Sequence, residues 1–117
     1  MKFEDLFDEN NEDHLFEMSN FRSNSTGLNG LEVWVRSDLG NHGHNRYRIK
    51  IRKNKIWAAI FTVSSNPILV NDINSSLTQK EQMQVLEWIK KNSSLIISHI
   101  DDKLTSGQLE YELQKRL

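Results

Sequence analysis

Two histidines and a run of alternating basic residues form the part of this sequence whose residue types could do chemistry. His42 and His44 lie one residue apart in the segment GNHGHN, which is rich in turn-forming residues. The residues that follow carry a positive charge at every second position, at Arg46, Arg48, Lys50 and Arg52. Alternate side chains of a β-strand point to the same face. The pattern therefore predicts a polar turn that leads into a strand with four cations on one face.

A metal-independent ribonuclease, such as a toxin, is the first activity that these residues would support. An imidazole such as His44 acts as a general acid or base near neutral pH, and a cation such as Arg48 stabilises the charge that develops on a phosphate during cleavage. The likeness to small ribonuclease toxins, which build their sites on a sheet, is an analogy at the level of the fold. No second titrating group is fixed by the sequence, so this enzyme is the alternative interpretation.

A metal site is a second possibility for the histidine pair. The spacing of His42 and His44 allows two imidazoles on one side of an extended strand, but a zinc site needs a third and a fourth ligand. The convenient candidates are Asp38, His14 and His99, none of which is spaced to complete a site, and the chain has no cysteine. The sequence therefore predicts no metal site and no cofactor.

Binding of an acidic partner requires fewer additional residues than catalysis or metal binding does. Four alternating charges span about 20 Å at ~3.3 Å per residue, which is long enough to meet several phosphates of a nucleic acid. Trp34 and Trp57 would add surface for stacking if either lies on the same face. The favoured prediction is a non-enzymatic interaction module that binds nucleic acid or an acidic protein through Arg46, Arg48, Lys50 and Arg52.

Segregated charge raises the possibility that the basic strand is already occupied. Residues 1–17 hold seven acidic side chains and one lysine, whereas residues 18–60 hold eight basic and two acidic side chains. The net charge of the whole chain, −1, hides this asymmetry. The acidic segment could fold back across the strand and neutralise it, and a charged strand face is also commonly the solvated side of an antiparallel sheet. The sequence leaves both alternatives open.

Composition bounds the remaining function classes. A chain of 117 residues, 37% of them hydrophobic, suits one globular domain. The absence of cysteine excludes a disulfide scaffold and fits a reducing compartment. No P-loop, GxGxxG or GxSxG motif supports nucleotide-binding, dehydrogenase or hydrolase chemistry. The apolar runs are too short to cross a bilayer. We expect a soluble, cytoplasmic protein with no membrane partner, and a homodimer stays possible.

Four segments carry the periodicity of short strands. Residues 31–36 and 46–53 alternate between apolar and polar side chains. Residues 56–63 are apolar on both faces, as in a central strand, and residues 67–70 begin with the only proline, as in an edge strand. Short connections favour antiparallel neighbours. We predict a small antiparallel sheet of three to four strands, preceded by a loop over residues 19–30.

Two or three helices are predicted to follow the sheet and to pack on one of its faces, which makes the fold class α+β. Thr78 and Glu81 form a capping-box pattern at the start of the first helix. Basic residues just before Asn92 leave two alternatives open, a helix that ends there and one that continues to residue 100. A last helix is expected over residues 108–117.

Several motifs of this chain occur together in a known family. They are LEVWV, a histidine followed by RIKI, NPILV, LEWIKKN and LEYELQKRL, with matching positions at Trp34, His44, Arg48, Lys50, Pro67, Trp88 and Asn92. From about Thr26 to Leu117 the chain therefore resembles small uncharacterised bacterial proteins related to domain of unknown function 4160. After WIKKN, where relatives tend to carry an aromatic pair, this chain has Ser98 and His99.

The resemblance implies a small sheet followed by helices, and it implies no activity. Some relatives look like members of toxin–antitoxin-type gene pairs. This likeness concerns the genetic context of the relatives and implies no catalytic reaction. The acidic start of the chain lies outside the resemblance. We therefore expect one α+β domain over residues 26–117 and an acidic N-terminal appendage over residues 1–25.

Overall fold

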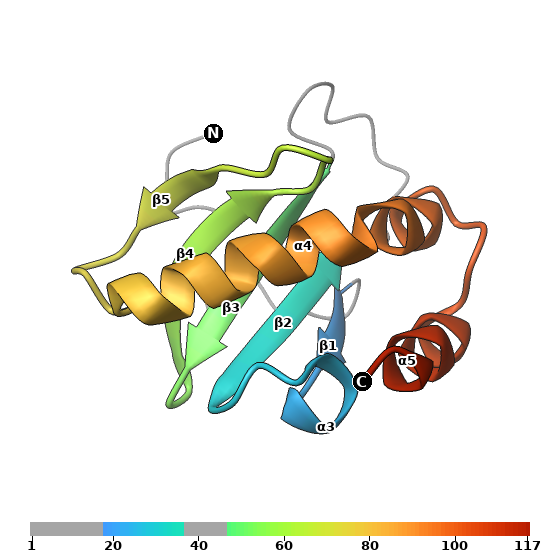
Figure 1. Cartoon of the computed structure of the whole chain (residues 1–117), viewed down its shortest axis with the longest axis horizontal. Helices are drawn as coiled ribbons and strands as arrows, with labels where there is room; N and C mark the ends of the chain where they lie inside the picture. Colours follow the sequence, from blue (N-terminus) through green and yellow to red (C-terminus); the bar gives the residue numbers. More distant parts are fainter. Residues whose placement is uncertain (1–17, 37–46) are drawn as a thin grey trace.

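The sheet has five antiparallel strands where the sequence pattern predicts three to four. The computed structural model describes residues 18–36 and 47–117, and within them the strands neighbour one another in chain order, from β1 to β5 (Figure 1). The strands are β1 (Met18–Phe21), β2 (Leu31–Arg36), β3 (Arg48–Lys53), β4 (Ile56–Thr62) and β5 (Leu69–Asp72). The predicted α+β fold with C-terminal helices is confirmed.

The fifth strand, β1, lies where the sequence predicts the start of a loop. β1 pairs with β2, so that Phe21 lies opposite Val33, and it is followed by one helical turn, α3 (Ser23–Thr26). Gly27 ends α3 with φ 77°, a left-handed conformation that glycine adopts without strain. The loop prediction is wrong at these residues because a strand of four residues, with Met18 and Phe21 at its ends and two polar residues between them, is too short to show a period of two.

The alternation of β3 divides its side chains between two environments, as predicted. Ile49 and Ile51 are fully buried in the core that faces the helices. The hydroxyl of Tyr47, just before β3, donates a 2.9 Å hydrogen bond to Asp101, the C-cap residue of helix α4 (Gln79–Ile100). Asn54 and Lys55 both have positive φ between β3 and β4, which is the conformation of a type I′ hairpin turn. The tight turn predicted at Asn54 is confirmed.

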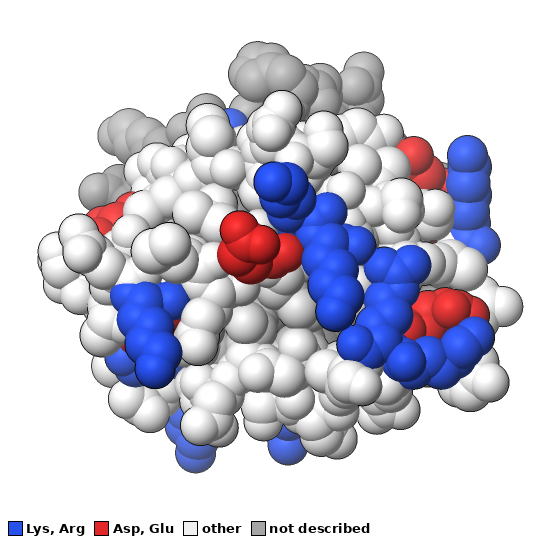
Figure 2. All heavy atoms as spheres, in the orientation of Figure 1, with Lys and Arg blue, Asp and Glu red and all other residues white. Residues whose placement is uncertain are grey.

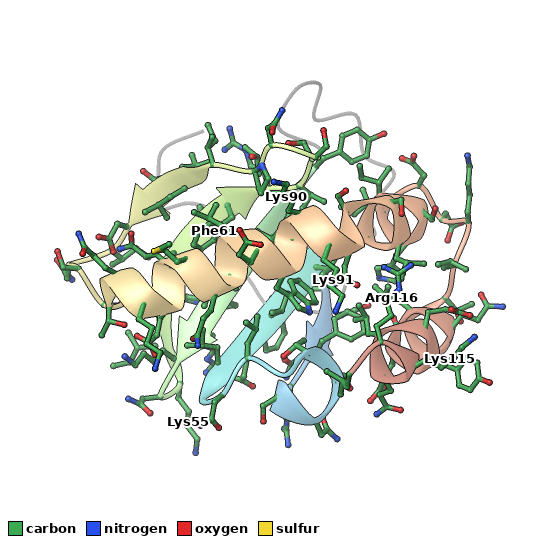
Figure 3. All side chains as sticks on the ribbon, in the orientation of Figure 1. Lys55, Phe61, Lys90, Lys91, Lys115 and Arg116 are labelled. Atoms are coloured by element: carbon green, nitrogen blue, oxygen red, sulfur yellow. The ribbon has the colours of Figure 1, made fainter. Side chains whose placement is uncertain are left out.

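One long helix, α4 (Gln79–Ile100), covers one face of the sheet (Figure 1). Its buried stripe packs with Val33, Ile51 and Phe61 of the sheet in a single core, and Phe61 is labelled in Figure 3. The helix continues through Asn92, which settles the alternative that the sequence left open. Asn92 is buried, and its side chain donates a 2.9 Å hydrogen bond to the carbonyl oxygen of Trp88. None of the described helices is long and apolar enough to span a membrane.

The last helix, α5 (Ser106–Lys115), packs against α3 and α4, and its Ser106 hydroxyl contacts the Ser19 hydroxyl of β1 beside His99 of α4. His99 Nδ1 lies 2.8 Å from the carbonyl oxygen of Leu104, and Nε2 lies 3.1 Å from the hydroxyl of Ser19, which also contacts the hydroxyl of Ser106. A carbonyl oxygen only accepts hydrogen bonds, so Nδ1 carries the ring hydrogen. Both nitrogens of this buried imidazole are therefore used within the fold.

The start of α4 depends on the Glu81 carboxylate. It accepts hydrogen bonds from the Thr78 N–H at 2.9 Å and from Lys53 Nζ at 2.8 Å, while the Thr78 hydroxyl accepts from the Glu81 N–H. Burial raises the pKa of the Glu81 carboxyl, but the hydrogen bonds from Lys53 and Thr78 outweigh burial and leave this pKa below its usual range. The predicted capping box thus also joins α4 to β3.

We expect Glu81→Gln to lower the free energy of unfolding by about 1 kcal/mol at neutral pH, because Gln keeps the cap but loses the charge that pairs with Lys53. A lowered folded-state pKa contributes stability above the unfolded pKa of about 4.3, and this stability is lost as the pH falls through the folded value. Urea unfolding from neutral to acid pH should therefore show the two proteins converging below about pH 4. A difference that is constant over this range would contradict the ionic role, and Glu87→Gln, at an exposed position, is the control.

Candidate partner-binding face of the sheet

The face of the sheet opposite α4 carries the three predicted basic residues that the structure describes. On β3, Arg48, Lys50 and Arg52 alternate with core residues, so they lie on this second face. The register gives them neighbours, and Lys50 lies between Trp34 of β2 and Ile60 of β4. We call this surface the basic sheet face, and its members are Glu32, Trp34, Arg48, Lys50, Arg52, Trp57 and Ile60.

A β-bulge in β4 brings Trp57 onto the basic sheet face. The pairing of β3 with β4 shifts register between Ile51 and Arg52, which leaves Ala58 as an extra residue and places Trp57 opposite Arg52. In a regular strand Trp57 and Ile60 would point to opposite faces, because they are three residues apart. The bulge puts both on the same face, next to the basic side chains.

The cations of this face lie against the two indole rings. Trp34 and Trp57 meet edge to face, with ring centroids 5.5 Å apart and an interplanar angle of 72°. The Arg52 guanidinium carbon lies 5.8 Å from the Trp34 ring centroid and 5.3 Å from that of Trp57, and Lys50 Nζ lies 5.8 Å from Trp57. Cation–π attraction of this kind contributes about 0.5–2 kcal/mol per pair, with the larger values where water is excluded.

The centre of the basic sheet face is closed to solvent. Lys50 is 8% exposed, Trp57 6% and Ile60 1%, although all three point away from α4. Lysine is almost never buried to this degree unless its ammonium is paired. A row of charges that simply extends into water does not describe this face, since of its three cations only Arg48 and Arg52 keep part of their surface exposed.

Three donor nitrogens on this face are buried and have no hydrogen-bond acceptor among the described residues. They are Trp34 Nε1, Arg48 Nε and Arg52 Nε. Glu32 Oε2 lies 3.9 Å from Arg52 Nε, which is too long for a hydrogen bond, and Glu32 Oε1 accepts from Asn20 instead. A buried donor without an acceptor costs about 1–3 kcal/mol. An added carboxylate or carbonyl oxygen would therefore be stabilised here.

Several predicted residues lie outside the described part of the chain. Arg46 belongs to the predicted basic row, and His42 and His44 to the ribonuclease interpretation. The structure places Arg48, the predicted partner of His44, on the basic sheet face. The ribonuclease stays a prediction, because both of its candidate histidines lie outside the described residues.

The described residues form no cluster of side chains that could bind a metal ion. Within residues 18–36 and 47–117, no three His, Cys, Asp or Glu side chains come together in a way that could hold a metal ion. His99, which the sequence offers as a third ligand, has both ring nitrogens engaged with Leu104 and Ser19. The other two candidates, Asp38 and His14, lie outside the described residues.

A second group of cations, for which the sequence pattern predicts no site, lies on the helices. Figure 2 shows the group as a run of blue side chains across α4 and α5, and Figure 3 labels its members. We call it the helix ridge, and it consists of Lys90, Lys91, Lys115 and Arg116. The adjacent basic pairs were the available signal, but basic residues are also common at helix ends.

Because Trp57 fills the centre of the basic sheet face, we expect Trp57→Ala to lower the free energy of unfolding by about 3–5 kcal/mol. Trp57→Phe should cost clearly less, since it keeps an aromatic ring beside Arg52. Urea unfolding followed by circular dichroism measures both effects. Tyr111→Ala, at an exposed aromatic residue of α5, is the control and should change stability by no more than about 0.5 kcal/mol. A loss below about 1 kcal/mol in Trp57→Ala would show that the face is not packed.

Comparisons with known proteins identify no relative from which a function could be inferred. No protein-family model, no curated protein and no solved structure matches the chain. The resemblance to domain of unknown function 4160 stays a prediction.

Proposed function

We propose that the protein is an interaction module whose basic sheet face binds an acidic segment of a protein partner. The observation that carries this proposal is the set of three buried donors, Trp34 Nε1, Arg48 Nε and Arg52 Nε, which lie on one face without acceptors among the described residues. Carboxylates are strong acceptors for guanidinium N–H groups. An acidic segment laid along β3 would supply acceptors and balance the positive charge at the same time.

An acidic polypeptide fits this face better than a nucleic acid does. Proteins that hold single strands without sequence preference stack the bases on accessible aromatic rings. Here Trp57 is buried, and both Trp57 and Trp34 pack against each other and against Arg52. The ring surfaces are therefore used inside the fold. What the face offers to a ligand is donors and positive charge, which suit carboxylates.

The chain also contains an acidic segment of its own, residues 1–17, with seven acidic side chains and one lysine. The segment is joined to β1 at Met18, and Asn20 of β1 lies opposite Trp34. It is thereby covalently joined to an edge strand of the sheet that carries the basic sheet face. A tethered ligand acts at a high effective concentration. Our proposal therefore includes residues 1–17 as a competitor of an acidic partner for this face.

A fluorescein-labelled poly-Glu peptide tests the binding function by fluorescence anisotropy with the full chain. Each arginine lost from a charge-assisted contact removes about 1.5–3 kcal/mol, so Arg48→Gln and Arg52→Gln should each weaken binding about tenfold or more. Arg52→Lys keeps the positive charge but removes the Nε donor. This variant therefore distinguishes the contribution of the donor to affinity from that of the charge. Lys90→Gln with Lys91→Gln, on the helix ridge, is the matched control.

Unchanged affinity in the folded Arg48→Gln/Arg52→Gln variant would disprove the proposed function. Equal weakening by the helix-ridge control would also count against it, since binding would then follow net charge and not this face. Circular dichroism and urea unfolding establish that each variant is folded before its affinity is compared.

Competition by the acidic segment has a separate test in the full chain. Replacing its seven acidic residues by Asn or Gln should tighten poly-Glu binding about tenfold or more, because an intramolecular competitor is weakened. The control replaces exposed acids elsewhere, in Asp72→Asn, Glu87→Gln and Asp102→Asn. If the affinity rises equally in both proteins, or in neither, residues 1–17 are not a competitor. The proposed binding by the basic sheet face is tested separately, by the arginine variants, and does not depend on this result.

A further inference from the structure

The helix ridge lies on the opposite side of the molecule from the basic sheet face. Lys90 and Lys91 belong to α4, whereas Lys115 and Arg116 end α5, and all four side chains are exposed (Figures 2 and 3). Cations at a helix end are favoured by the helix dipole, but this effect acts only within the last turn. Lys90 and Lys91 lie well before the end of α4 at Ile100, so the dipole does not account for them.

Arg116 is held in place by the backbone and by a buried side chain of α4. Its Nη1 donates to the carbonyl oxygen of Lys91 at 3.0 Å and to Asn92 Oδ1 at 3.1 Å. Asn92 is 3% exposed, and its own amide nitrogen is fixed by the bond to the Trp88 carbonyl. The position of the guanidinium is therefore set by the fold, although Arg116 itself is at the surface.

The bonds of Arg116 leave one edge of its guanidinium available. A guanidinium has five N–H groups, and the two on Nη1 are those used by Lys91 and Asn92. The N–H groups of Nε and Nη2 make no hydrogen bond to a described residue. Two parallel N–H groups of a guanidinium form the fork that binds two oxygens of a phosphate or carboxylate. Arg116 thus presents a preorganised oxyanion-binding edge.

Three of the four cations of the helix ridge have no carboxylate partner among the described residues. Lys91 Nζ lies 3.5 Å from the carbonyl oxygen of Arg116, so the Lys91 ammonium is held close to the Arg116 backbone. The ion pairs between described residues join Lys53 to Glu81, Arg52 to Glu32 and Lys115 to Glu112. Lys90, Lys91 and Arg116 are in none of them. Repulsion among these cations would be relieved by a bound anion.

We propose that the helix ridge binds the phosphodiester backbone of a nucleic acid. Arg116 takes one phosphate on its free edge, and the lysines neutralise the phosphates on either side. A row of cations that extends over two helices, as Figure 2 shows, suits a chain of phosphates better than a single anion. This site is separate from the basic sheet face, and its binding does not depend on the function proposed for that face.

A fluorescein-labelled single-stranded oligo-dT, titrated with the full chain at rising salt, tests this proposal. Neutralising four phosphates of a single strand should give a slope of log affinity against log salt of about −3, since each contact contributes about −0.7. Lys90→Gln with Lys91→Gln should reduce the slope to about −1.4 and weaken binding at low salt more than tenfold. Arg116→Lys, which keeps the charge but loses the fork, should weaken binding about tenfold with a nearly unchanged slope.

The matched control is Lys55→Gln with Lys80→Gln, which removes two exposed cations outside the helix ridge; Figure 3 shows Lys55 at the far end of the sheet. Equal loss of binding in this control and in the Lys90→Gln/Lys91→Gln variant would overturn the proposal, as would the absence of binding by the unaltered chain. Full displacement of oligo-dT by millimolar inorganic phosphate would also overturn it, because the ridge would then be a site for a single anion. If oligo-dT binding is lost only in the Arg48→Gln/Arg52→Gln variant, the nucleic acid binds at the basic sheet face. That outcome would also contradict the proposal.

Discussion

The packing of α4 onto one face of the sheet is the constraint on which the other features depend. The apolar stripe of α4 and the inward residues of β2, β3 and β4 form one core, and their burial is the main favourable term in a domain of this size. Because strand side chains alternate, placing Ile49 and Ile51 in that core commits Arg48, Lys50 and Arg52 to the opposite face. The candidate binding face is thus a consequence of core formation.

The basic sheet face is a second packed layer, made of aromatic and cationic side chains where the core on the other face has mostly aliphatic ones. Trp34 and Trp57 supply apolar area, and the cations lie against their rings. A face of this kind gains from excluding water, since cation–π attraction strengthens on desolvation, but it leaves donor nitrogens without acceptors. The same burial that stabilises the layer therefore leaves the unsatisfied donors on which the proposed binding of an acidic segment rests.

Positive charge is gathered at two surfaces of a chain whose formal net charge is only −1. On the basic sheet face the charges belong to one strand, and alternation alone places them together. On the helix ridge they come from two helices, and the contact of Arg116 with Lys91 and Asn92 places them together. Local charge density, and not the sum over the chain, decides where an anionic partner is attracted.

The sequence alone determined the features that depend on neighbouring residues: the period of β3, the turn at Asn54, the capping box of α4 and the α+β class. It did not show β1, because an edge strand of four residues without alternation becomes a strand only through its pairing with β2. The bulge at Ala58 and the meeting of Arg116 with Lys91 were likewise decided by tertiary structure. Both join residues whose proximity depends on strand register or helix packing, which no local pattern encodes.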